Sequence, residues 1–140
     1  MAVPDVSVYL SFPQWIFGGI APNNPTFFPG YGFLLTPWGW MSGSGLHTVA
    51  LLFNSVAAGF SLILAARLAK SLGAGPKLEM LVGLLVAIHP SLSASSRIGW
   101  PETCLSLAVL LTCLAVQSND WTRAGLITGL SLTLHPRLIV

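Results

Sequence analysis

Charge is what this sequence has least of. Only 7% of its 140 residues are Asp, Glu, Lys or Arg, whereas 54% are hydrophobic. A soluble domain has about 25% charged residues, because its surface must be solvated by water. The formal net charge of +2 is small and forms no dense basic cluster, so a nucleic-acid-binding function is excluded. The chain is therefore expected to face lipid.

Several chemical signatures are also missing. The sequence contains no glycine-rich phosphate loop, no zinc-ligand spacing and no Ser-His-Asp signature, so it gives no support for a nucleotide or other soluble cofactor. Cys104 and Cys113 share one apolar run. On a helix they would lie about 13 Å apart, too far for a disulfide, so they are interpreted as small apolar core residues.

We interpret both ends of the chain as cut. The first four residues contain no basic n-region of a signal peptide, and the last three, 138–140, lie within an apolar run. We expect a fragment of a longer polytopic protein or a truncated gene model, with one incomplete membrane domain that is inactive by itself.

Long apolar runs dominate the rest of the chain. A transmembrane helix needs about 20 mostly apolar residues. Four such runs are predicted, and they occupy 44–70, 78–96, 101–118 and 122–140. Residues 1–43 hold six of the ten prolines and are predicted to form an outer loop, with short interfacial helices at 6–20 and 31–40 and irregular chain at 21–29. The predicted fold is all-α, a polytopic transmembrane helix bundle.

The basic residues predict how the bundle is oriented. Arg67, Lys70 and Lys77 flank the turn between the first two spans, and Arg123 follows the turn between the last two. Cytoplasmic loops are enriched in Lys and Arg, so both turns are placed inside the cell. Residues 1–43 and the connection at 97–100 then face outward. The expected location is the cell membrane, with several passes.

The remaining polar residues gather toward the outer face under this topology. The candidate site residues are Asp5, Tyr9, His89, Arg97, Glu102, His135 and Arg137. Ionisable groups at membrane depth are costly and often functional. Simpler interpretations stay open: Asp5 as a helix cap, Glu102 as a partner of the helix dipole, Arg97 as an interfacial anchor, and the histidines as interhelical hydrogen-bonding residues. Asn54 is likewise interpreted as an interhelical contact.

Residues 83–90 and 129–136 form a weak internal repeat, in which each segment runs from Gly-Leu to His-Pro. Transporters use such repeats and broken helices. A transporter or carrier subunit is therefore a second hypothesis, and an inactive polytopic fragment is a third.

The predicted outer loop contains a distinctive series of residues. Asp5 is followed by Tyr9, then by the run Trp15-Ile16-Phe17-Gly18-Gly19, then by the aromatic and proline-rich stretch at 27–37. Pro90 and Glu102 continue the pattern further along the chain. In this order the features resemble the GT-C superfamily of polytopic membrane glycosyltransferases. The sequence departs from that family at Gly30, where many relatives have a second proline, and it lacks a transmembrane helix before Asp5.

The resemblance implies a reaction and assigns roles to the candidate residues. Asp5 would be the catalytic base for a mannosyltransferase-like transfer of an unidentified sugar from a polyprenyl-phosphate donor to an unidentified external acceptor. Arg97 and Arg137 would stabilise the phosphate leaving group, while Tyr9, His89, Glu102 and His135 would line the substrate pocket. The implied partners are the lipid bilayer and the lipid-linked donor. No resident metal is predicted, although some relatives use a divalent metal ion.

Overall fold

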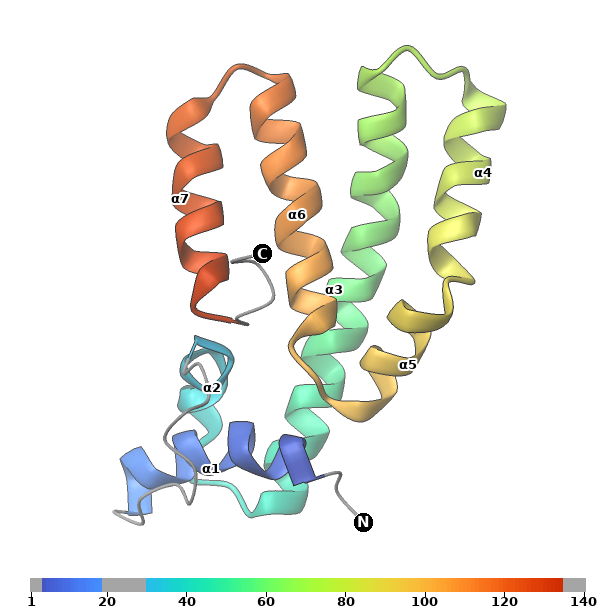
Figure 1. Ribbon diagram of the computed structural model, residues 1–140. Coiled ribbons are helices and arrows are strands. Elements are labelled where there is room, and N and C mark those ends of the chain that lie inside the picture. Colours follow the sequence, from blue (N-terminus) through green and yellow to red (C-terminus); the bar gives the residue numbers. More distant parts are fainter. Residues whose placement is uncertain (1–3, 19–29, 135–140) are drawn as a thin grey trace.

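The described part of the chain folds as helices joined by short connections. The computed structural model describes residues 4–18 and 30–134, with the side chains of residues 4–6 and 96 outside that description. Two helical hairpins stand side by side: α3 (Gly43–Ser71) with α4 (Pro76–Ala87), and α6 (Glu102–Gln117) with α7 (Trp121–Leu132) (Figure 1). No strand occurs within the described residues. The predicted all-α class is confirmed.

Helix α3 is the central helix and packs against both α4 and α6. It begins after Ser42, whose hydroxyl accepts a hydrogen bond from the Gly45 backbone N–H at 3.4 Å. Its buried residues follow helical spacing and are mostly small: Leu46, Ala50, Asn54, Ala57, Ser61 and Ala65. Small side chains let neighbouring helices approach closely.

One described helix, α3, is long and apolar enough to cross a membrane. Its 29 residues extend about 43 Å at 1.5 Å per residue, close to the full thickness of a bilayer with its headgroups. Helix α6 is also apolar but has only 16 residues. The predicted bundle of four spans therefore remains a prediction.

The two hairpin turns have the same geometry. Each turn contains a residue with positive φ, Gly73 at 89° and Asn119 at 57°. In each turn the next backbone N–H bonds back across the helix end, from Ala74 to the Ala69 carbonyl at 3.0 Å and from Asp120 to the Ala115 carbonyl at 2.9 Å. Both turns lie at the same end of the molecule, as predicted (Figure 1).

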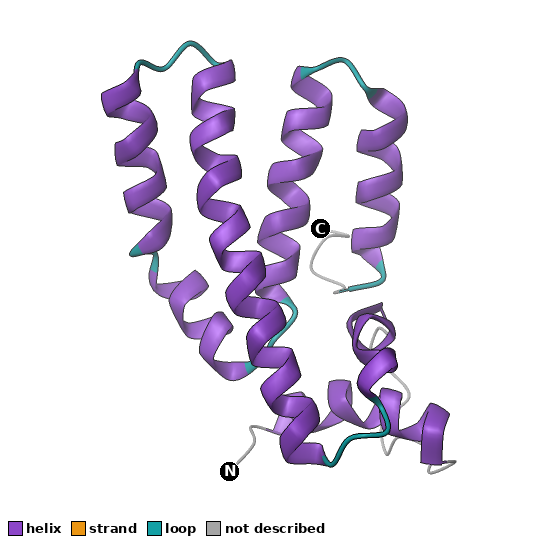
Figure 2. Ribbon diagram, turned by 180° about the vertical axis from the view of Figure 1, so that it is seen from behind, coloured by secondary structure: helices purple, strands orange, loops and turns teal. Residues whose placement is uncertain are grey.

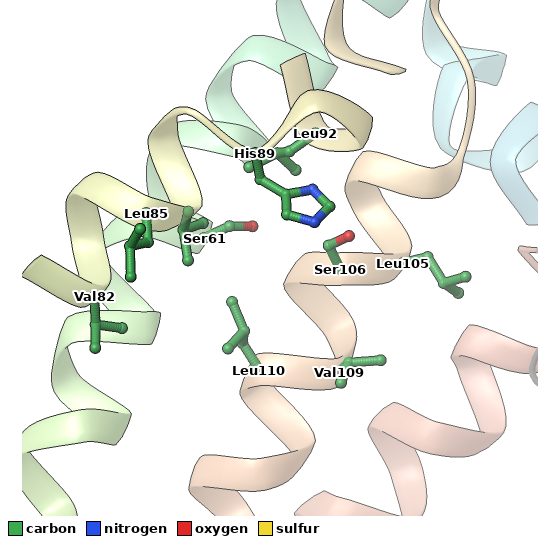
Figure 3. A pocket seen from close by; sticks show the side chains of 10 residues that line it. Ser61, Val82, Leu85, His89, Leu92, Leu105, Ser106, Val109 and Leu110 are labelled. Atoms are coloured by element: carbon green, nitrogen blue, oxygen red, sulfur yellow. The ribbon is translucent and has the colours of Figure 1, made fainter. Parts of the chain in front are cut away.

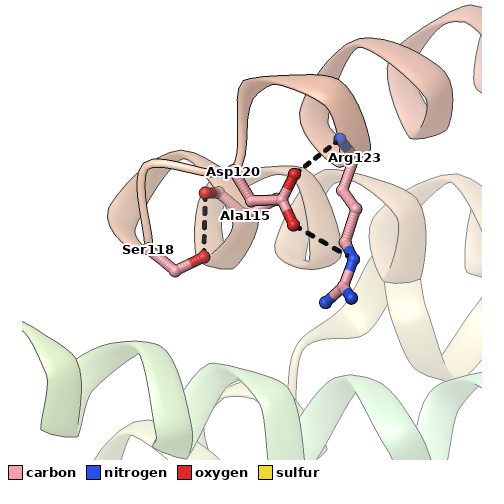
Figure 4. A network of polar contacts seen from close by, with 4 residues as sticks. All are labelled: Ala115, Ser118, Asp120 and Arg123. Carbon is pink, nitrogen blue, oxygen red and sulfur yellow. Dashed lines mark hydrogen bonds and ion pairs between the residues drawn. The ribbon is translucent and has the colours of Figure 1, made fainter.

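Asp120 makes a second set of contacts in the turn between α6 and α7. Its Oδ1 atom accepts a hydrogen bond from the Arg123 backbone N–H at 3.0 Å, which caps α7. Its Oδ2 atom lies 3.1 Å from Arg123 Nε (Figure 4). The Arg123 side chain is 79% exposed, so the cap matters more here than the ion pair.

The run predicted as one span at 78–96 is broken. Helix α4 ends at Ala87, and α5 (Pro90–Ile98) starts after His89, whose ψ of 121° is extended. A proline disfavours helical geometry in the preceding residue and has no N–H to donate, so the helix is interrupted before Pro90. Figure 2 shows α5 leaving the axis of α4.

The N-terminal elements lie at the end of the molecule opposite the two turns. Helix α1 (Pro4–Gly18) lies across the base of the hairpins, with α2 (Gly30–Leu35) and the short helix η1 (Thr36–Trp38) beside it (Figure 1). The Trp15, Ile16 and Phe17 side chains are exposed on α1. These elements correspond to the short helices predicted at 6–20 and 31–40, whereas the irregular chain predicted at 21–29 lies outside the described residues.

Candidate functional site

A buried polar network lies between α2, α3, α5 and α6, centred on Asn54, which has no exposed surface. Asn54 Nδ2 donates to the Trp100 carbonyl at 2.7 Å and to the Ser95 carbonyl at 3.3 Å. Asn54 Oδ1 accepts from the Tyr31 hydroxyl at 3.1 Å and from the Cys104 thiol at 3.6 Å. One amide therefore joins four elements, and the interhelical role predicted for Asn54 is confirmed.

Tyr31 connects this network to the N-terminal helix. Its ring is fully buried and meets the Tyr9 ring of α1 edge to face, with centroids 5.8 Å apart and planes at 88°. Burial raises the pKa of the Tyr31 phenol well above its ordinary value, and the nearby Cys104 and Glu102 act in the same direction. The phenol therefore stays protonated and serves as a hydrogen-bond donor.

The connection between α5 and α6 forms the wall of the network. Gly99 has a φ of 79°, and a Cβ atom there would lie 3.4 Å from the His47 ring. His47 Nδ1 and Trp100 Nε1 are buried and have no hydrogen-bond partner within the described residues. An indole N–H is only a donor, so an oxygen atom of a ligand or a water molecule would satisfy Trp100.

The structure places three predicted site residues close to this network. Tyr9 is 5% exposed and packs against Tyr31. Glu102 is the first residue of α6, where a carboxylate complements the helix dipole, and it is near enough to Tyr31 to act on the phenol electrostatically. Asp5 belongs to α1, one helical turn before Tyr9, but its side chain lies outside the described part.

The other predicted residues are placed elsewhere. Arg97 lies exposed in the last turn of α5. His89 precedes α5 and makes no capping hydrogen bond with its side chain. His135 and Arg137 lie outside the described residues, so their predicted roles stay predictions.

His89 belongs to a separate feature, an apolar groove of about 500 Å³ between α4 and α6. Ser61 of α3 forms its floor, and its walls are Val82, Leu85, Val86, Leu92, Leu105, Ser106, Val109 and Leu110. The His89 ring points into this space, opposite Ser106 (Figure 3). The volume lies within the range of small-molecule sites.

Tyr31, His47 and Trp100 were not among the residues predicted from the sequence. Each belongs to a hydrophobic or aromatic segment, where a core position is the ordinary expectation. Their polar atoms are recognised as part of a site only in the structure, where the Asn54 amide faces the start of α6. Polar residues at helical spacing along α3, such as Asn54 and Ser61, are the one sequence signal pointing to that face.

Comparison with family models, with curated proteins and with solved structures finds no match for this chain. Within the described ranges, no group of three or more His, Cys, Asp or Glu side chains is arranged to hold a metal ion. The function must therefore be argued from the chain's own geometry.

Proposed function

We propose that this chain is part of a polytopic membrane glycosyltransferase, which transfers a sugar from a polyprenyl-phosphate donor to an acceptor outside the cytoplasm. One observation carries the proposal. The basic hairpin turns lie at one end of the helices, while α1 and α2, which carry Tyr9 and Tyr31 of the buried network, lie at the other end (Figure 1). Positive turns favour the cytoplasm, so the network faces outward.

Helix lengths and exposed side chains support a proposed arrangement in the membrane. Helix α3 spans the bilayer, and α4 with α5 forms a second, broken span. Helices α6 and α7 supply the remaining crossings, each with large apolar side chains exposed, including Val109, Leu126 and Leu130. Helix α1 lies in the outer interface, where Trp15 and Phe17 suit headgroup depth.

The proposed reaction uses Asp5 as general base. The Asp5 carboxylate accepts the proton of an acceptor hydroxyl while that oxygen forms a bond to the anomeric carbon of the sugar. The bond between the anomeric carbon and the phosphate oxygen breaks, and polyprenyl phosphate leaves with the electron pair. Arg97 and Arg137 stabilise this anion, because a guanidinium binds phosphate with two parallel hydrogen bonds.

The Asp5→Asn variant tests the proposal. It is assayed in membranes isolated from cells that express the chain from its natural reading frame. With a labelled polyprenyl-phosphate sugar, transfer should fall by about a hundredfold or more, the contribution of one general base. Asp120→Asn is the matched control, because Asp120 lies at the opposite end and its replacement still caps α7. Undiminished transfer by Asp5→Asn would refute the assigned base.

A transporter is the second candidate, and the break between α4 and α5 favours it. A transporter must expose its site alternately to both sides of the membrane. A cysteine replacing Ser93 on α5 would then react with impermeant thiol reagents from either side in turn. A glycosyltransferase with an outward site predicts reaction from the outside only, together with sugar transfer.

A further inference from the structure

We propose that the groove between α4 and α6 binds an uncharged long-chain lipid alcohol, with the hydroxyl of the lipid beside His89. This inference does not depend on the proposed glycosyl transfer, but it rests on the proposed location of the helices in a membrane. It rests on the lining of the groove, on the hydrogen bonds already made by its serines, and on its depth in the bundle.

The walls of the groove require an apolar occupant. The groove encloses about 500 Å³ and is lined almost entirely by aliphatic side chains. Aliphatic walls do not hold ordered water. Leu85 and Val109, one on each wall, are 55% and 45% exposed, so the groove is open from the side where lipid chains lie.

The polar atoms of the groove select the head of that occupant. The Ser61 hydroxyl donates to the Ala57 carbonyl at 2.8 Å, and the Ser106 hydroxyl donates to the Glu102 carbonyl at 3.0 Å. Both serine protons are used, so the serine oxygens can only accept. Ser61 is fully buried, so the exposed Ser106 oxygen is the serine acceptor that a ligand can reach. The His89 ring can donate or accept, because one nitrogen of a neutral imidazole carries a proton.

This donor and acceptor set fits a hydroxyl better than a phosphate. A hydroxyl donates one hydrogen bond to a serine oxygen and accepts one from the imidazole. A fully ionised phosphate only accepts, so it would face the serine lone pairs without a proton between them. None of the described residues lining the groove is a lysine or an arginine that could neutralise it.

The depth of His89 in the bundle also favours a hydroxyl over a phosphate. Helix α4 has 12 residues, so His89 lies about 20 Å from the basic turn at 1.5 Å per residue, within the apolar part of the bundle. A charged head at that depth is expensive, whereas a hydroxyl with its hydrogen bonds satisfied is not.

Photolabelling of the full chain in its membrane tests the proposal. Three diazirine probes of equal chain length are compared, carrying a terminal hydroxyl, a terminal phosphate or only hydrocarbon. The alcohol should label α4 and α6 about fivefold more than the hydrocarbon, as one net hydrogen bond of about 1 kcal/mol predicts. The alcohol should also exceed the phosphate, and excess unlabelled alcohol should suppress its labelling.

Two valines of α6 provide a matched pair. Val109→Trp fills the groove and should abolish labelling, whereas Val116→Trp, on the same helix and similarly exposed but outside the groove, should not. His89→Phe should reduce alcohol labelling to the hydrocarbon level. Stronger labelling by the phosphate, equal labelling by alcohol and hydrocarbon, or full labelling of Val109→Trp would each overturn the proposal.

Photolabelling tests the lipid groove independently of sugar transfer. Asp5→Asn should label like the unmodified chain, because Asp5 lies on α1 and not in the groove. Loss of transfer with intact labelling, or the reverse, therefore identifies which proposal fails.

Discussion

The Tyr31 hydroxyl donates a hydrogen bond to Asn54 Oδ1 across 3.1 Å, and through it α2 is tied to the middle of α3. The same amide holds the Trp100 carbonyl just before α6 begins. Residues far apart in the sequence thus meet at one side chain, and the position of the candidate site depends on it.

Replacing Asn54 with Leu should lower the free energy of unfolding by about 2 kcal/mol. Leu has a similar volume, so the loss comes from the Trp100 carbonyl left without this donor and from the Tyr31 hydroxyl left with only its longer bond to the Ala50 carbonyl at 3.5 Å. Thermal unfolding in detergent measures the change. Ser55→Ala is the control, since Ser55 is exposed and bonds only within α3, and it should be nearly neutral. Equal effects of the two variants would contradict the network.

Tyr31 should make stability depend on pH in the alkaline range. Burial raises the pKa of the phenol above its unfolded value of 10.0, so its stabilising effect is complete below that pH. Above that pH the unfolded chain loses the proton first, and stability falls as the pH rises. Tyr31→Phe should flatten this dependence. Ultraviolet titration of tyrosine ionisation should show Tyr31 resisting deprotonation until the chain unfolds.

Gly30 should tolerate no side chain. Its N–H donates to the Thr133 carbonyl at 2.9 Å, and a Cβ atom there would approach that oxygen to 2.6 Å. Gly30→Ala must push α2 away from the end of α7, at a cost of about 1–3 kcal/mol. Gly129→Ala within α7 meets open space and should stabilise slightly. Similar melting temperatures for the two variants would show that this contact is absent.

The orientation in the membrane can be measured with single cysteines. In a chain with Cys104 and Cys113 replaced by Ala, Ser44→Cys marks the outer end of α3 and Ser71→Cys marks the basic turn. An impermeant maleimide should label the first in intact cells and the second only in inverted vesicles. Labelling of both from one side would exclude the proposed topology.

Much of the fold could be predicted from the sequence because the local signals are strong. The apolar runs and the Gly73 turn define the helical hairpins, and the basic residues mark the end where the turns meet. The break before Pro90 was harder to predict, because 78–96 is apolar enough on average to be interpreted as one span, although His89 and four serines interrupt it. Average hydrophobicity does not report backbone geometry.

The candidate site was less accessible to prediction. Tyr9 and Glu102 stood out as polar residues in apolar surroundings, and the structure places both near Tyr31. The Tyr31–Asn54 contact could not be predicted, because it joins residues 23 positions apart through the tertiary packing of α2 on α3. The groove could not be predicted from the sequence either, since its two walls come from different hairpins.

The matching turns at Gly73 and Asn119 bear on how the molecule is built. Each turn makes its hydrogen bonds within a few residues of the chain, so under the proposed membrane topology each helix pair could insert as one unit before the two pairs meet. Assembly is then the docking of two preformed units along α3 and α6, which pack against each other and bury the small residues Ala57 and Ala108. Mutations along that seam should slow maturation in the membrane while leaving insertion intact.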